Sequence, residues 1–247
     1  MNPKLPILVL ALVTVLSAQT AKTPEVVPVD QEPMHKLVFE NEYVRVFSVE
    51  VPAGGETKYH RHERDYVGVM LGVAEVESVR LGEAPQAFTF QDGDVRFSKG
   101  GFVHKAVNKG EKPFRNVTVE LKKGSSGSVD VCAAPKQCMR TSEMGGHVIS
   151  VTTTLFTSRQ LRAFRHTLSA RGSLGSSYYS PNSEDNILIV PLTGLSVSLD
   201  GEAKKLNAGE PWFGSVREVE VSAGAEDVSW VVLRLTLPPK ASSGGSK

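Results

Sequence analysis

The chain has 247 residues, of which 40% are hydrophobic and 22% are charged, and its formal net charge is +1. This composition is ordinary for a soluble globular protein, and the length allows one or two domains with cores of their own. The near-neutral charge, without a basic stripe that carries interleaved aromatic residues, excludes nucleic acid as an expected partner.

Residues 1–21 have the pattern of a secretory signal peptide. Lys4 supplies a positive charge, the run from Leu5 to Ala18 is apolar, and small and polar residues follow it. Because this run is too short to span a bilayer comfortably, we expect it to be cleaved, with an uncleaved anchor as the alternative. The mature chain is therefore expected to be exported, to the periplasm or the extracellular space, with no attachment to the membrane.

The rest of the chain reads as β structure. Short runs rich in Val, Phe, Tyr and Thr alternate with Gly, Pro, Asn and Asp at intervals of roughly eight to twelve residues, which predicts an all-β sandwich or barrel. Within residues 22–122 we expect strands at Val44–Val51, Tyr66–Val79, Ala87–Phe90, Asp94–Ser98, Val103–Val107 and Asn116–Leu121.

Three of the six histidines lie in two short segments that are both β-like, one of them before Tyr66 and the other the predicted strand Val103–Val107. His60 and His62 are separated by one residue, so in a strand their side chains point to the same face. His104 comes from another predicted strand, and Asp65 follows His62 closely. Three imidazoles and a carboxylate would form a site for a borderline divalent ion.

Residues 123–146 interrupt the β pattern and are predicted to be a linker, because they begin with flexible Gly- and Ser-rich sequence. Cys132 and Cys138 lie in a loop-like segment of this linker. In an oxidising compartment we expect them to form a local disulfide. A thiolate metal pair is the alternative, and it would need further ligands, of which only His147 lies nearby.

The β pattern resumes over residues 147–238, and residues 239–247 are expected to be a disordered tail. The second half resembles a degenerate copy of the first, since Val44–Phe47 aligns with Leu161–Phe164 at an offset that also aligns Gly55 with Gly172. The second half has no histidine cluster, which predicts a duplication with one candidate site; a chance match is the alternative.

The two histidine segments resemble the motifs of the cupin superfamily. The second motif, G-x5-P-x-G-x2-H-x3-N, is matched at Gly93, Gly101, His104 and Asn108, with Lys99 in place of the proline. The first motif, G-x5-H-x-H-x3/4-E-x6-G, is matched at Gly54, His60 and His62. The positions expected for its glutamate hold Tyr66 and Val67, and Asp65 stands one residue early.

This resemblance implies two cupin-like antiparallel jelly-roll barrels, with a metal at the mouth of the N-terminal barrel. His60, His62 and His104 would be ligands and Asp65 a fourth; Asp65 could instead pair with Arg61 or Arg64, or hold a histidine's far nitrogen. The ion would be iron, manganese, nickel, copper or zinc, and a carboxylate ligand favours iron or manganese.

Other residues near the two motifs could contact a small molecule bound beside the metal. We expect the Tyr66 hydroxyl near the site and Arg96 at the mouth, where Arg96 would meet an anionic ligand. Glu120 is either an inward acid or base or a solvated strand-edge carboxylate. The remaining histidines are interpreted as structural or surface residues: His35, His147 and His166.

The sequence thus predicts an exported cupin-domain protein that binds one divalent metal ion and a small molecule. Two readings stay open: a metal-dependent enzyme whose reaction the fold does not select, and a non-catalytic ligand-binding or structural protein. Association into a homo-oligomer is compatible with either reading.

Overall fold

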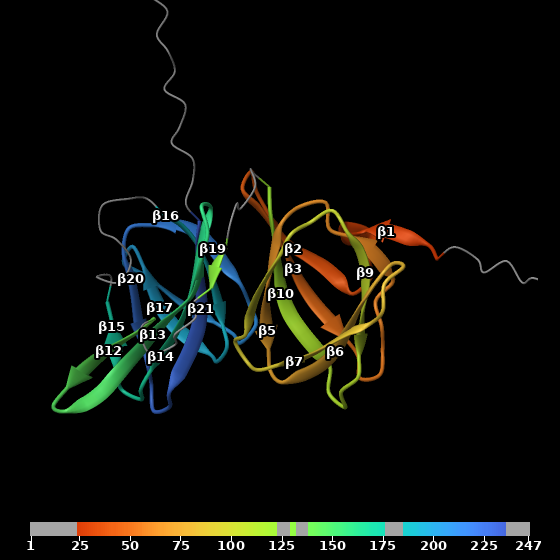
Figure 1. Ribbon diagram of the computed structural model, residues 1–247. Helices are drawn as coiled ribbons and strands as arrows, with labels where there is room; N and C mark the ends of the chain where they lie inside the picture. The colour runs from red at the N-terminus through yellow and green to blue at the C-terminus, as the bar shows by residue number, and fades with distance from the viewer. Residues whose placement is uncertain (1–23, 123–128, 132–137, 176–184, 236–247) are drawn as a thin grey trace, which may run out of the picture.

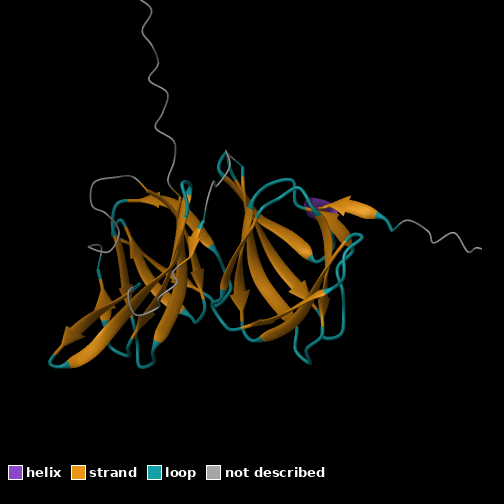
Figure 2. Ribbon diagram, in the orientation of Figure 1, coloured by secondary structure: helices purple, strands orange, loops and turns teal. Residues whose placement is uncertain are grey.

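The computed structural model describes residues 24–122, 129–131, 138–175 and 185–235. Strands make up nearly all of the regular structure in these ranges, and η1 (Val29–Gln31) is a short 3-10 helix (Figure 2). No helix within the described ranges is long and apolar enough to cross a membrane. The predicted signal peptide, Cys132 and the predicted tail lie outside the described residues.

The first half forms a barrel from two five-stranded sheets (Figure 1). One sheet has the order β1-β4-β9-β6-β7 and the other the order β2-β3-β10-β5-β8. The strands are β1 (Val26–Pro28), β2 (His35–Glu40), β3 (Val44–Val51), β4 (Tyr59–Arg61), β5 (Tyr66–Leu71), β6 (Ala74–Arg80), β7 (Gln86–Phe90), β8 (Val95–Ser98), β9 (Val103–Asn108) and β10 (Phe114–Leu121). All pairs are antiparallel except that of β1 with β4, which is parallel.

One predicted strand in this half is two strands in the structure. Tyr66–Val79 divides into β5 and β6 at Gly72. The φ of Gly72 is +90°, a backbone conformation that glycine adopts readily. The Gly72 amide donates a hydrogen bond of 2.7 Å to Oδ1 of Asp92, which holds the turn. Strands β1 and β2 have no counterpart among the predicted strands, and β2 carries His35, whereas β4 falls in the β-like segment of His60.

The second half repeats the first. Its strands are β11 (Asp130–Val131), β12 (Met139–Met144), β13 (His147–Thr157), β14 (Leu161–Leu168), β15 (Ser173–Leu174), β16 (Asp185–Pro191), β17 (Leu195–Leu199), β18 (Glu202–Leu206), β19 (Trp212–Val216), β20 (Val219–Ser222) and β21 (Val228–Leu235). The order β13-β14-β21-β16-β19 matches β2-β3-β10-β5-β8, and β15-β20-β17-β18 matches β4-β9-β6-β7. The two antiparallel jelly-roll barrels expected from the sequence are therefore present.

Parts of the predicted linker are strands, namely β11 and β12, which both pair with β13. β12 lies within residues 123–146 and pairs antiparallel with β13 from Met139↔Thr153 to Met144↔His147. The turn between the two strands contains Gly145 and Gly146, both with positive φ. The flexible sequence at the start of residues 123–146 predicted a linker throughout, whereas Gly145 and Gly146 at its end form the turn of a hairpin.

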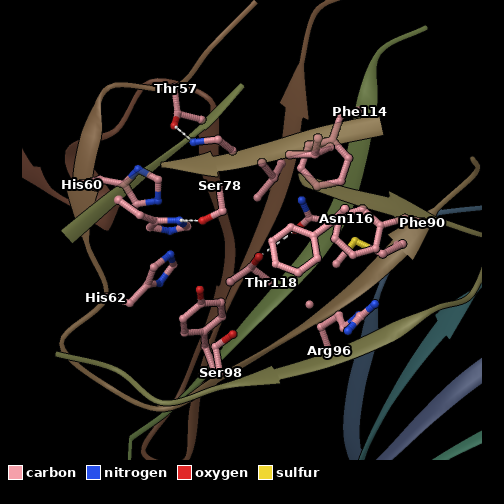
Figure 3. Close-up of a pocket in the computed structure, with 18 of the residues that line it drawn as sticks. Thr57, His60, His62, Ser78, Phe90, Arg96, Ser98, Phe114, Asn116 and Thr118 are labelled. Atoms are coloured by element: carbon pink, nitrogen blue, oxygen red, sulfur yellow. Dashed lines mark hydrogen bonds between the residues drawn. The ribbon is translucent and has the colours of Figure 1, made fainter. Parts of the chain in front are cut away.

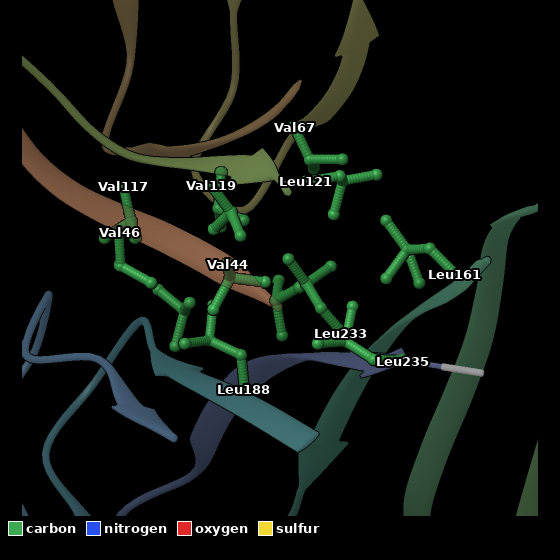
Figure 4. Close-up of a cluster of buried hydrophobic side chains, with 14 of the residues drawn as sticks. Val44, Val46, Val67, Val117, Val119, Leu121, Leu161, Leu188, Leu233 and Leu235 are labelled. Atoms are coloured by element: carbon green, nitrogen blue, oxygen red, sulfur yellow. The ribbon is translucent and has the colours of Figure 1, made fainter. Parts of the chain in front are cut away.

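The two barrels pack against each other through one hydrophobic cluster (Figure 4). On β10 the side chains alternate: Val117, Val119 and Leu121 belong to this cluster, whereas Phe114, Asn116 and Thr118 line the interior of the first barrel. The partners in the second barrel include Leu161 of β14, Leu188 of β16 and Leu233 of β21. Strand β10 is therefore buried on both faces, one apolar and the other partly polar.

The interior of the second barrel is packed with apolar side chains. Its cluster includes Leu168, Ile187, Ile189 and Val232 around Trp230, which has no exposed surface. In the first barrel the corresponding space is a cavity, and this difference places the candidate site in the N-terminal barrel.

Candidate metal centre

His60 and His104 are brought together by strand pairing. They lie directly opposite each other on β4 and β9, and their ring centroids are 4.6 Å apart. His62, two residues beyond His60, lies on the same side, with ring centroids 5.1 Å from His60 and 5.6 Å from His104. The structure therefore gathers the three predicted histidines on one wall of the barrel interior (Figure 3).

His35 joins this group, although the sequence analysis interpreted it as a structural or surface residue. It is the first residue of β2, and its ring centroid lies 4.6 Å from that of His60 and 5.8 Å from that of His62. One ligand nitrogen each from His35, His60 and His62 lie within 4.8 Å of one another, an arrangement that could hold a metal ion. The site thus draws on the N-terminal segment as well as on the two motif segments.

Each of the four imidazoles has its Nδ1 atom engaged. His60 Nδ1 lies 2.9 Å from the carbonyl oxygen of Lys58, and His104 Nδ1 lies 3.1 Å from Oγ of Ser78. A carbonyl oxygen only accepts, so His60 carries its proton on Nδ1 and its Nε2 has a free lone pair.

The other two Nδ1 atoms contact buried carboxylates. His35 Nδ1 lies 2.7 Å from Oε2 of Glu32, and His62 Nδ1 lies 3.1 Å from Oε1 of Glu120. Metal-bound histidines in proteins commonly donate their far nitrogen to a carboxylate or carbonyl, which fixes the tautomer and the ring orientation. The same arrangement occurs here around His35, His60 and His62.

The Nε2 atoms of His60 and His104 are buried and have no hydrogen-bond partner among the described residues. A buried polar atom without a partner costs free energy, and a bound ion at these two nitrogens would remove that cost. The two nitrogens are imidazole nitrogens from adjacent strands, a donor type that fits a divalent ion such as iron, nickel, copper or zinc.

Burial also keeps these histidines neutral, the form that binds metal. Desolvation, followed by repulsion from neighbouring imidazoles, lowers the pKa of His60 to about 3 and that of His104 to about 2. Desolvation, followed by the charges of His35 and Arg45, lowers the pKa of His62 to about 3. At neutral pH these three side chains therefore have no proton to lose before they bind an ion.

Glu120 is the buried acid of this site. It is 1% exposed, and its second oxygen, Oε2, accepts a hydrogen bond of 3.3 Å from Nη1 of Arg45. Burial raises the pKa of Glu120, and the charges of Arg45 and Arg64 oppose that rise. Of the two roles considered for it, the inward orientation is the one that the structure shows.

Asp65 is not brought to the histidines. Its Oδ1 accepts a hydrogen bond of 3.1 Å from the backbone amide of Gly100, and it is absent from the described lining of the cavity, whereas Tyr66 is part of it. Successive side chains along an extended segment point in opposite directions, so a carboxylate one residue early faces away from the site. Beside His60 and His62 the structure places the imidazole of His35 rather than the carboxylate of Asp65.

Tyr66 packs flat on His62, with ring centroids 4.0 Å apart and an interplanar angle of 20°. The Tyr66 hydroxyl forms a hydrogen bond with the side chain of Ser98, and burial raises the pKa of Tyr66. Tyr66 therefore takes the place of the motif's glutamate without being an ionised oxygen donor at neutral pH.

A cavity of about 300 Å³ adjoins the histidines. Its other walls are largely aromatic and aliphatic, with a few polar side chains: Val49, Met70, Val76, Phe88, Phe90, Phe97, Phe102, Phe114, Thr57, Ser78, Ser98, Asn116 and Thr118. Arg80, Gln86 and Arg96 complete the polar part of the lining. Space for a small molecule therefore lies directly beside the candidate ligands.

The second barrel has different residues at the matching positions. In the first barrel one row across three paired strands reads His35, Val49 and Asn116. The row at the same place in the second barrel reads Thr152, His166 and Trp230.

His166 is 2% exposed, its Nδ1 lies 2.9 Å from Oγ1 of Thr152, and its ring stacks on Trp230. The bulky indole occupies the place where Asn116 borders the cavity, so the interior of this barrel is core.

The comparisons with known proteins show the fold. No protein-family model and no curated protein sequence matches this chain. Among solved structures, AerE from Microcystis aeruginosa is similar with a TM-score of 0.57 and 11% identity, over 83% of this chain and 99% of that one.

A cupin 2 conserved barrel domain protein from Leptotrichia buccalis is similar with a TM-score of 0.52 and 12% identity, over 81% of this chain and 87% of that one. A salicylate 1,2-dioxygenase from Pseudaminobacter salicylatoxidans is similar with a TM-score of 0.51 and 11% identity, over 78% of this chain and 71% of that one. Together with the repeated strand order, these likenesses show that the chain has the cupin fold, built twice along its length.

Proposed function

We propose that this protein binds one divalent transition-metal ion in its N-terminal barrel, through His60, His62 and His104 with His35 as a further ligand. The observation that carries the proposal is the pair of buried Nε2 atoms, on His60 and His104, that lack partners among the described residues. Their Nδ1 atoms are already bonded, so Nε2 is the nitrogen left to bind an ion.

The chemistry of the proposed ligands narrows the choice of metal ion. With Asp65 bonded to Gly100 instead, the proposed ligands are imidazoles only. Imidazole suits iron, nickel, copper and zinc, whereas manganese prefers carboxylate and carbonyl oxygens. We therefore expect one of the first four metals rather than manganese, a shift from the preference that a carboxylate ligand would give.

The ion would act on, or help to bind, a small molecule in the adjoining cavity. A bound ion of this kind supplies Lewis acidity toward a ligand oxygen. The chain's own residues orient the site: Glu32 and Glu120 hold two imidazoles, and Tyr66 packs on His62 and limits its rotation. Catalysis and ligand binding without catalysis are both compatible with this arrangement.

The test is the metal content of the mature protein purified without chelators or a His-tag. The protein should carry near-stoichiometric metal, and the His60→Ala/His104→Ala double variant should lose it. His147→Ala is the control, because His147 is exposed on the β12–β13 hairpin. Absence of metal from the wild-type protein even after reconstitution, or equal metal content in all three proteins, would refute the proposal.

We also propose that the protein is exported after removal of residues 1–21. The support is the charged and apolar pattern of that segment.

A further inference from the structure

The cavity beside the histidines has an uneven distribution of charge. Among its described lining residues are the arginines Arg80 and Arg96, and none is an aspartate or a glutamate. The buried carboxylates behind the histidines, Glu32 and Glu120, are bonded to His35 and His62, and Glu120 also to Arg45. A ligand inside the cavity therefore meets positive charge without a compensating acid on the walls.

Arg96 lies across the cavity from His60 and His62 (Figure 3). Its guanidinium carbon is 5.7 Å from the ring centroid of Phe88 and 5.6 Å from that of Phe90. Arg96 is exposed, so its guanidinium packs near these rings at the solvent-facing side of the cavity.

Arg96 forms no ion pair with any residue in the described ranges, whereas Arg80 has Glu83 at 4.0 Å and Arg45 is paired with Asp30 at 2.7 Å. A guanidinium presents its donors in a planar fork that matches a carboxylate, and within the described part of the chain that fork of Arg96 meets no acidic side chain.

The space between Arg96 and the histidines suits an apolar body. Phe88, Phe90 and Phe114 line it together with Met70. A cavity of about 150 Å³ is enough for benzene, and this one measures about 300 Å³. A ring-sized body that carries one carboxylate would therefore fit, and the volume lies at the lower end of the range for small-molecule pockets.

We infer that this cavity takes a small monocarboxylate with an apolar, ring-sized body. The carboxylate pairs with Arg96, the body lies against Phe88, Phe90 and Phe114, and the opposite end faces the histidines. The inference rests on the proposed function only where it places the end of the ligand opposite the carboxylate beside a metal ion. The contacts with Arg96 and the aromatic wall do not need the metal.

The test uses three probes: benzoate, its neutral isostere benzamide, and acetate, which has the charge without the apolar body. Affinities are measured by calorimetry or ligand-observed NMR on the full-length mature protein, with zinc bound and after chelation. Arg96→Ala and Arg96→Gln are the variants, and Gln keeps much of the side chain against the Phe rings. The control is Arg115→Ala, because Arg115 is exposed on β10 between Phe114 and Asn116.

We expect benzoate to bind more tightly than benzamide and acetate. Both Arg96 variants should weaken benzoate by about tenfold, the size of one lost charge-assisted hydrogen bond. They should leave benzamide unchanged, and Arg115→Ala should leave all three affinities unchanged. The loss in the variants should appear with and without zinc.

The outcomes separate this inference from the metal proposal. Benzoate binding that requires zinc and ignores Arg96 would place the carboxylate on the metal and overturn the inference while the metal site stands. Equal affinities for benzoate and benzamide, or no binding by any probe, would also overturn it. Arg96-dependent binding in a protein that takes up no metal would support the inference and refute the metal proposal.

Discussion

Glu120 Oε1 lies 3.1 Å from Nδ1 of His62, so a buried carboxylate on β10 holds an imidazole from the segment after β4. The contact joins residues that are 58 positions apart in the chain. It exists because β10 turns its polar residues into the first barrel and its valines toward the second. The packing between the barrels therefore helps to orient one of the proposed metal ligands.

Replacement of Glu120 by Gln should weaken metal binding by about ten- to a hundredfold, the usual effect of losing an acid behind a ligating histidine. The amide keeps the size of the side chain but removes the charge that holds Nδ1–H of His62. The affinity is measured by competition with a chromogenic chelator. Glu50→Gln is the control, since Glu50 is exposed on β3. Equal affinities in both variants would contradict this role of Glu120.

The metal-free protein should lose stability in acid. Burial lowers the pKa of His60 to about 3 and that of His104 to about 2, while the unfolded chain has histidine pKa values of about 6.5. Below about pH 6.5 the unfolded state therefore binds more protons than the folded state. The free energy of unfolding is fully present above that pH and falls as the pH drops, by at most about 1.4 kcal/mol per unit and histidine.

Urea unfolding of the chelator-treated protein between about pH 7 and about pH 4 measures this slope. The His60→Ala/His104→Ala variant should lose stability less steeply over the same range, because it lacks two of the groups that take up protons on unfolding. Parallel profiles for the two proteins would show that these histidines do not govern the acid sensitivity.

Truncation of Leu233 to Ala should lower the free energy of unfolding by about 2–5 kcal/mol, the range for a large-to-small change in a packed core. Leu233 has no exposed surface and lies in the cluster between the barrels. Leu81→Ala is the matched control, since Leu81 is 42% exposed. Urea denaturation compares the two variants, and similar values would mean that the interface contributes little.

The secreted chain should begin after residue 21 and carry a disulfide between Cys132 and Cys138. Cys132 lies outside the described residues, so this pairing stays a prediction from the sequence. Intact mass analysis without reductant should show two hydrogens fewer than the reduced chain. Free thiols that alkylate without reductant would contradict the disulfide. An N-terminus that retains residues 1–21 would contradict the cleavage.

The motif histidines could be predicted from the sequence because their spacing is local. His60 and His62 need only a two-residue strand repeat, and the segment from Gly93 to Asn108 fixes His104. His35 has no such local signal, because its place in the site depends on β2 lying beside β3 in one sheet while β4, which carries His60, lies in the other sheet. Only the tertiary arrangement shows it.

The directions in which the side chains of Glu120 and Asp65 point could not be predicted from the local sequence. The alternation of β10 indicates one polar and one apolar face, and a solvated polar face is the usual interpretation. Here the apolar face is covered by the second barrel, so the polar face turns inward, a fact that depends on an interface the local pattern does not reveal. For Asp65, a shift of one residue reverses the direction of the side chain, and a motif match does not resolve that shift.

The fold itself follows from the sequence more fully than the site does. Turn residues at regular intervals predict the jelly roll, and the aligned segments Val44–Phe47 and Leu161–Phe164 begin the matching strands β3 and β14. The packed interior of the second barrel could not be predicted from the sequence, because Trp230 looks like an ordinary core residue of a strand. Only its position opposite His166 shows that it fills the space of a cavity.

The most direct test of the central claim is anomalous diffraction from crystals of the protein with its metal bound. We expect one strong peak inside the N-terminal barrel, within bonding distance of Nε2 of His60, His62 and His104 and beside His35. A peak at another site, or the metal on exposed histidines such as His147 with the barrel interior free of density, would contradict it.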